Sequence, residues 1–112
     1  MTLNAIEPPQ PFDAQMVLRM SLQAERASAL LKALGHAQRL MILCHLSTGP
    51  KTVSEIEAKL GARQAAVSQH LARLRQDGLV TAARDGKSIT YDIADPNVRA
   101  MIDLLYGLYC KT

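Results

Sequence analysis

Residues 53–80, VSEIEAKLGARQAAVSQHLARLRQDGLV, are the stretch of this 112-residue sequence that decides its fold. Gly61 ends one short helix, and Gly78 ends a second, which is predicted over residues 63–77. Two short helices joined at a glycine are typical of a helix-turn-helix.

The helix that precedes Gly61 carries its own start signal. Ser54 and Glu57 have the spacing of a capping box, in which each side chain binds the backbone N–H of the other residue. Thr52 and Glu55 offer the same pattern two residues earlier. Either pair predicts a short helix that ends at Leu60.

Residues 80–93 change from a helical period to a period of two. Ile89, Tyr91 and Ile93 alternate with polar side chains, which is typical of a half-buried strand. Asp85-Gly86 is a strong turn signal within this segment. A β-hairpin therefore follows the helix pair, and it has the position of a wing beside a helix-turn-helix.

Three further helices are predicted, over residues 13–34, 37–46 and 96–110. The middle one is apolar nearly all round, so it should be central and buried. The other two carry apolar stripes, and a domain this small leaves enough apolar surface to suggest self-association. The first stripe comprises Val17, Met20, Ala24, Ala27, Leu31 and Leu34, and the last comprises Val98, Met101, Ile102, Leu105, Leu108 and Tyr109.

The predicted fold class is mainly α with a β-hairpin wing, in the order of four helices, a hairpin and a last helix. One winged helix-turn-helix domain, for DNA binding and dimerisation, is expected over residues 13–112. Residues 1–12 contain three prolines and are predicted to form a flexible N-terminal arm.

The helix over residues 63–77 has a face suited to a DNA groove. Val67, Leu71 and Leu74 share the core side, and small or amide side chains lie opposite them. Glutamine can bind an adenine edge, and arginine can reach guanine or phosphate. The predicted DNA contacts are Gln64, Ser68, Gln69, His70 and Arg73 on this helix, with Arg84 and Lys87 on the hairpin. For His70, a boundary position bonded to backbone is an equal alternative.

The charge distribution agrees with a polyanionic partner. Residues 61–90 carry five basic and two acidic side chains, whereas the rest of the chain carries eight of each, so the net charge of +3 lies in one segment. A solvated face with chance clustering would show the same charges, so charge alone does not decide. An ordinary amphipathic surface helix would not explain the basic hairpin.

Four segments resemble motifs of the ArsR family of repressors: residues 33–43, ALGHAQRLMIL, residues 53–56, VSEI, residues 67–74, VSQHLARL, and residues 76–80, QDGLV. The similarity extends over about residues 14–110, and Ala37 departs from the proline that is frequent in the family. The resemblance implies a homodimer built from the first and last helices. It also implies repression at an inverted-repeat DNA operator until an inducer binds.

The two cysteines are similar to the dithiol of a subgroup of this family, the sulfide- and persulfide-responsive repressors BigR, SqrR and HlyU. The segments that carry this likeness are residues 42–46, ILCHL, and residues 108–110, LYC. The likeness implies that Cys44 and Cys110 are sensor thiols, which reactive sulfur species join by an intrasubunit disulfide or polysulfide bridge. On the helical pattern alone, Cys44 is expected to be a core residue, whereas Cys110 lies away from the apolar stripe.

Metal sensing by the family's known sites is not expected. The start of the third helix has no thiol, and the last helix has no histidine. A site that uses Cys44 or Cys110 stays open, as do general oxidants or haem as the inducer. No cofactor is expected.

Other classes of protein have less support. Two cysteines without a general base do not indicate a thiol peroxidase, so an enzyme is not expected, and a winged helix used only for protein contacts is a further alternative. No signal peptide and no long apolar run is present, so a cytoplasmic protein that does not contact membranes is expected.

Overall fold

The computed structural model describes residues 13–61 and 63–111. Within these two ranges, five helices and three short strands follow one another. They are α1 (Ala14–Leu34), α2 (Ala37–Leu46), β1 (Lys51–Thr52), α3 (Val53–Leu60), α4 (Gln64–Gln76), β2 (Val80–Asp85), β3 (Ser88–Ile93) and α5 (Pro96–Tyr109). The predicted winged helix-turn-helix is therefore confirmed, while the predicted arm, residues 1–12, lies outside the described residues.

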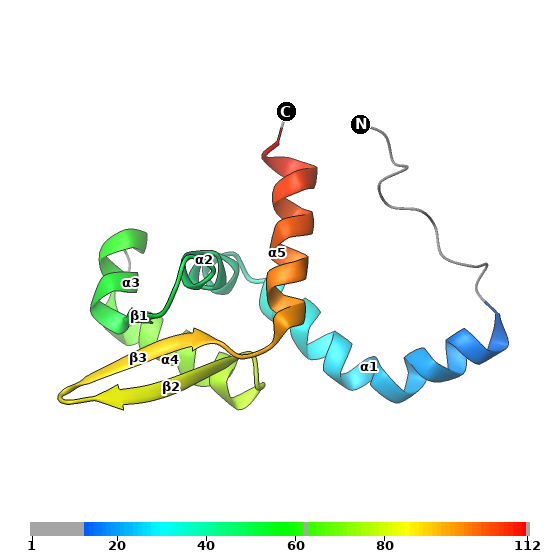
Figure 1. The fold of residues 1–112 in the computed structure, drawn as a ribbon. Helices are drawn as coiled ribbons and strands as arrows, with labels where there is room; N and C mark the ends of the chain where they lie inside the picture. Colours follow the sequence, from blue (N-terminus) through cyan, green and yellow to red (C-terminus); the bar gives the residue numbers. More distant parts are fainter. Residues whose placement is uncertain (1–12, 62, 112) are drawn as a thin grey trace.

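The arrangement in Figure 1 places α2 in the middle of the molecule. The α3–α4 pair and the hairpin lie on one side of α2, and α5 stands on the other side. Helix α1 joins the body only at its C-terminal end and extends away from it. None of the helices described is both long and apolar enough to cross a membrane.

Local capping fixes the helix boundaries close to the predicted ones. The side chain of Asp13 accepts a hydrogen bond from Met16 N at 2.9 Å, so α1 begins one residue later than expected. At α3, Thr52 and Glu55 form the capping box, and not Ser54 and Glu57. Gly61 ends α3 with φ +64°, a left-handed conformation that glycine adopts without steric cost.

The hairpin forms at the predicted turn. Strands β2 and β3 pair antiparallel, with Arg84 opposite Ile89 and Asp85 opposite Ser88, and Gly86 turns the chain with φ +65°. Strand β1 was not predicted. It pairs with β3 through Lys51 opposite Tyr91, so the sheet order is β1-β3-β2 and the base of the wing is bonded to the segment that leads into α3.

The core lies where α2 meets the helix-turn-helix. Ile42, Leu43 and Leu46 of α2 are fully buried, as the apolar character of this helix predicted. Facing side chains from the other elements are also fully buried: Ile56, Val67, Leu71, Leu74 and Val98. Arg99 of α5 adds a polar tie, because its guanidinium donates to the carbonyl oxygen of Ser47 at 2.9 Å.

The long apolar stripe of α1 is largely exposed within one chain. Only Ala33 and Leu34 of this helix are buried, whereas Val17, Met20 and Leu31 are each more than half exposed. The predicted stripe is present, and the described residues, 13–61 and 63–111, leave most of it uncovered.

We expect Leu46→Ala to lower the free energy of unfolding by about 2–5 kcal/mol, because it leaves a cavity at the centre of the core. Met41→Ala, on the same helix but 43% exposed, should cost about 1 kcal/mol or less. Urea unfolding at one protein concentration measures both. Equal losses for the two variants would contradict this assignment of the core.

Candidate nucleic-acid interface and thiol site

Helix α4 turns an apolar face inward and a polar face to solvent. Val67, Leu71 and Leu74 are fully buried, so the rotation of the helix about its axis is fixed. The side chains on the outer faces are exposed, namely Gln64, Ser68, Gln69, Ala72 and Arg73. The structure thus places four of the five predicted contacts of this helix on its outer surface.

The wing brings two further predicted residues to the same side of the fold. Arg84 at the end of β2 and Lys87 in the turn are both exposed. Lys87 and Gln64 line one hollow of about 400 Å³ between the starts of α3 and α4 and the hairpin, together with the hydroxyl side chains of Ser54 and Ser88. Residues 23 positions apart in the sequence are therefore neighbours on one concave surface.

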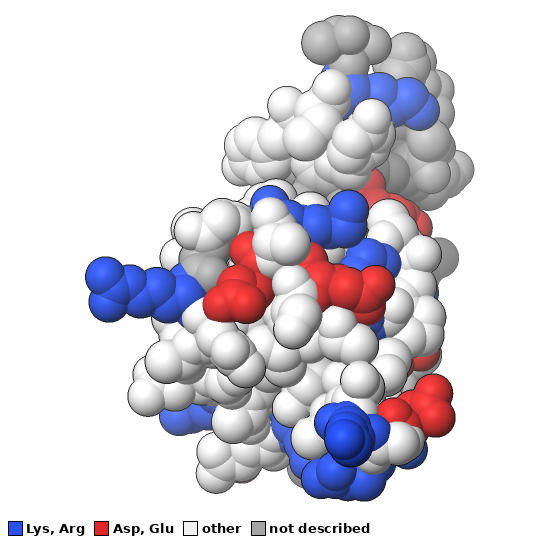
Figure 2. Space-filling model, turned by 90° about the vertical axis from the view of Figure 1, so that its left-hand side faces the viewer, with Lys and Arg blue, Asp and Glu red and all other residues white. Residues whose placement is uncertain are grey.

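Figure 2 views this end of the molecule, with the wing tip at the lower edge. Lys and Arg side chains gather at that edge and project at the left of the view, and others lie directly above a band of acidic side chains in its middle. Further acidic side chains lie at the right edge, beside the lower basic group, so the two signs of charge are mixed on this face and its densest basic group is at the lower edge. A partner that contacts only the middle of this face would meet carboxylates.

Arg73 is held loosely. Its Nε lies 3.4 Å from a carboxylate oxygen of Asp77, one turn later on α4, and the arginine side chain is 56% exposed. Exposed ion pairs of this kind contribute little to stability. The guanidinium can therefore exchange Asp77 for another acceptor at low cost.

His70 differs from the other predicted contacts, because its ring points toward α2. Arg39 Nε donates to His70 Nδ1 at 3.2 Å, and His70 Nε2 lies 3.1 Å from the amide oxygen of Gln38. The His36 ring packs against it with a centroid distance of 4.7 Å. Both ring nitrogens are occupied, so in this conformation His70 holds α4 against α2, and its partners are side chains, not the backbone groups considered as the alternative.

The electrostatic surroundings of His70 favour the neutral ring. Burial lowers the pKa of His70, and the nearby His36 and Arg39 lower it further. The hydrogen bonds agree, because a ring that accepts at Nδ1 carries its proton on Nε2 and can donate to Gln38.

The two cysteines line one groove between α2 and α5, of about 480 Å³. Cys44 on α2 is half-buried, and Cys110, the residue that ends α5, is exposed. Both are free thiols. Burial raises the pKa of Cys44, and the neighbouring Cys110 raises it further. Cys110 is therefore the more accessible thiol, and burial disfavours the thiolate form of Cys44.

The walls of this groove are mainly apolar. Leu40 and Met41 contribute from α2, and Ile102 and Leu105 from α5. This groove was not predicted from the sequence. The sequence does show one wall of the groove, because Leu40, Met41 and Cys44 lie within about one turn of α2. It does not show that this turn packs opposite α5.

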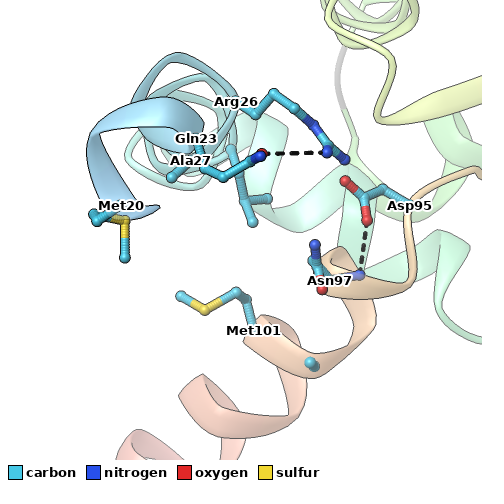
Figure 3. A pocket seen from close by; sticks show the side chains of 9 residues that line it. Met20, Gln23, Arg26, Ala27, Asp95, Asn97 and Met101 are labelled. Carbon is cyan, nitrogen blue, oxygen red and sulfur yellow. Dashed lines mark hydrogen bonds between the residues drawn. The ribbon is translucent and has the colours of Figure 1, made fainter. Parts of the chain in front are cut away.

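A second groove, of about 380 Å³, separates α1 from the start of α5. Figure 3 shows Met20 of α1 and Met101 of α5 pointing into it. At its polar end, Asp95 accepts a hydrogen bond from the backbone N–H of Asn97 at 2.9 Å (Figure 3). This groove continues the exposed apolar surface of α1.

Metal-binding side chains do not cluster in the described part of the chain. Across residues 13–61 and 63–111, no group of three or more His, Cys, Asp or Glu side chains is placed to hold an ion.

Comparison with known proteins identifies relatives along almost the whole chain. Residues 36–82 match the family described as "Bacterial regulatory protein, arsR family". The chain is 41% identical to the transcriptional activator HlyU of Vibrio cholerae over 92 residues, which are 82% of this chain and 85% of HlyU. It is 37% identical to the biofilm growth-associated repressor of Agrobacterium fabrum over 109 residues, which are 97% of this chain and 93% of the relative.

A solved structure shares the fold. The transcriptional repressor BigR from Xylella fastidiosa superimposes with a TM-score of 0.77 at 34% identity, covering 84% of this chain and 96% of BigR.

His70 gives a prediction on pH. Because the folded chain lowers its pKa, His70 stabilises the fold fully above the ordinary value of 6.5, and this contribution is lost as the pH falls below 6.5 through the lowered value. In an NMR titration, the His70 ring should titrate below 6.5, and Arg39→Gln should move its pKa back toward 6.5. His45 is the internal control, because burial, Lys59 and Lys51 lower its pKa without Arg39. If Arg39→Gln leaves the pKa of His70 unchanged, the assigned contact is contradicted.

Proposed function

The chain belongs to the ArsR family of bacterial regulatory proteins, as the motifs in its sequence predicted, and on that premise we propose that it is a homodimeric transcriptional repressor. It binds an inverted-repeat operator in double-stranded DNA. It leaves the DNA when Cys44 and Cys110 react with a persulfide or polysulfide. The observation that carries DNA binding is the orientation of α4, whose buried residues leave Gln69 and Arg73 facing solvent beside the basic wing.

Each exposed side chain of α4 and the wing has a role on the duplex. Gln69 reads a base edge, for which adenine is the geometric match, and Arg73 reaches guanine or a phosphate. Gln64 and Ser68 lie in the first turns of α4, where recognition helices contact bases. Arg84 and Lys87 bind backbone phosphates from the wing. His70 positions α4 through its bonds to α2 and touches no base.

A second copy of the chain covers α1 and α5. The exposed apolar side chains on these two helices need a neighbour, and a copy of the same chain supplies a matching surface through a two-fold axis. The groove of Met20 and Met101 receives apolar side chains of that copy. The two-fold axis presents two α4 helices to half-sites about 34–36 Å apart, one turn of DNA.

The proposed thiol chemistry begins at Cys110, because this thiol is exposed. Its thiolate attacks the terminal sulfur of a persulfide R–S–SH, which forms a Cys110 persulfide and releases R–SH. The Cys44 thiolate then attacks the Cys110 Sγ and releases H₂S. One persulfide and two thiols thus give one disulfide, R–SH and H₂S. Two persulfides give a trisulfide bridge, two R–SH and one H₂S.

Helix α2 carries the effect of the bridge to the DNA. Cys44 lies on α2, and so do Ile42, Leu43 and Leu46, which form the core beneath the helix-turn-helix. A bond to Cys110 fixes α2 against α5, the proposed dimer helix. The angle between the two α4 helices then changes, and both cannot enter grooves on one side of a duplex.

The inducer and the sign of regulation each have an alternative. Exposed Cys110 is also open to general oxidants, and haem or a metal bound at the thiols would be a different inducer for the same repressor. Relatives of the chain are described as an activator and as a repressor, so the sign of regulation is part of the proposal.

DNA binding is tested with a duplex selected by the full chain from a random pool. We expect Gln69→Ala to weaken binding by about 1–3 kcal/mol and to relax the preference at one base pair. Lys87→Gln should weaken binding to all duplexes alike. It should also reduce, by about one, the steepness with which the logarithm of the affinity falls with the logarithm of the salt concentration. Arg19→Gln, on α1 but off its apolar stripe and not on α4 or the wing, is the control. Unchanged affinity for both test variants would refute the assigned interface.

The thiol switch is tested with Cys44→Ser and Cys110→Ser. A persulfide donor should lower the operator affinity of the unchanged protein about 100-fold, a typical allosteric coupling of about 2–3 kcal/mol, and dithiothreitol should restore it. Both variants should stay bound to the operator after the same treatment. Mass spectrometry after persulfide, peroxide or haem treatment identifies the product. If both variants release DNA as the unchanged protein does, the thiols are not the switch.

A further inference from the structure

The groove beside the two thiols has a composition that would discriminate among sulfur donors. Its walls are built from Leu40, Met41, Ile102 and Leu105, and Asp103 is the one charged side chain among its lining residues, all of which the structure describes. Lys111 follows Cys110 and is exposed, but it does not line the groove. Tyr106 and Tyr109 also line it, so a molecule that approaches both thiols through the groove meets mainly apolar side chains, two phenol rings and one carboxylate.

We propose that this groove selects apolar, uncharged sulfane-sulfur donors and that Asp103 is a specificity-determining residue that disfavours anionic ones. The inference rests on the proposed function of Cys44 and Cys110 as sensor thiols, and it names the class of molecule that reaches them. The preferred donor is an organic persulfide or polysulfide with a small hydrocarbon group, in contrast to an anionic peptide donor.

The size and polarity of the groove support this class. At about 480 Å³, it is within the range of sites for small molecules, and it can hold a short sulfur chain with an alkyl group. Moving one methylene from water to such a surface favours binding about fourfold. Asp103 is exposed, and its carboxylate opposes the entry of a second negative charge by Coulomb repulsion that the solvent partly screens.

An organic trisulfide oxidises the two thiols in two successive exchange steps. The Cys110 thiolate attacks an outer sulfur of R–S–S–S–R, forms a mixed disulfide Cys110–S–S–R and releases the persulfide R–S–S⁻. The Cys44 thiolate then attacks the Cys110 Sγ and releases R–S⁻. Two thiols and one trisulfide give one protein disulfide, one R–SH and one R–S–SH, so the trisulfide is the oxidant and the thiol pair is oxidised.

The experiment compares two trisulfides with the same reactive sulfur chain, diethyl trisulfide and glutathione trisulfide, the second of which is a net anion. The loss of free thiol in the reduced full-length protein gives a second-order rate for each donor. Each rate is divided by the rate of the same donor with N-acetylcysteine amide, which corrects for intrinsic reactivity. We expect a corrected preference of about tenfold for diethyl trisulfide.

Three variants locate the source of the preference. Asp103→Asn should speed the reaction with glutathione trisulfide about threefold and leave diethyl trisulfide unchanged. Met41→Gln replaces an apolar wall residue at an exposed position by a polar one of similar length. It should slow only the reaction with diethyl trisulfide. Glu57→Gln makes the same change of acid to amide on α3, away from the groove, and should alter neither rate.

The outcomes separate this inference from the proposed switch. If the two donors form the Cys44–Cys110 disulfide and release DNA with no corrected preference, or if Asp103→Asn changes nothing, the selectivity is refuted and the switch stands. If neither donor joins the thiols, both the switch and the selectivity are refuted.

Discussion

The packing of α2 is the constraint on which the rest of the structure depends. Ile42, Leu43 and Leu46 of this helix are fully buried, and side chains of α3, α4 and α5 meet them in one core. Close-packed interiors do not deform continuously, so a change in the seating of such a helix moves its neighbours as bodies. A single ten-residue helix thus holds the α3–α4 pair and the hairpin on one side and α5 on the other.

The outward face of α4 is a consequence of the same packing. Because Val67, Leu71 and Leu74 are buried at helical spacing, the polar side chains between them must face solvent. His70 refines this orientation from the side through Arg39 and Gln38, which are both on α2. The proposed reading face therefore depends on α2 twice, through the core and through this polar contact.

Local signals made most of the fold predictable, and long-range contacts made the rest unpredictable. Caps, glycines and periodicity placed the five described helices and the hairpin turn within one or two residues, with the start of α3 left open between two capping pairs. Strand β1 was missed because two residues carry no period, and its pairing partner Tyr91 is distant in sequence. At the site, the exposed positions of Gln69 and Arg73 follow from periodicity. The contacts of His70 and the groove shared by Cys44 and Cys110 depend on how separate helices pack.

The central claim is that a bond between Cys44 and Cys110 changes the position of α4, and that α2 transmits this change. Backbone amide NMR spectra of the reduced protein, and of the same protein after a persulfide donor has joined the two thiols, test this most directly. The account predicts shift changes along α4, from Gln64 to Gln76, as well as around both cysteines. Changes confined to the two turns around Cys44 and Cys110, with α4 unmoved, would contradict it.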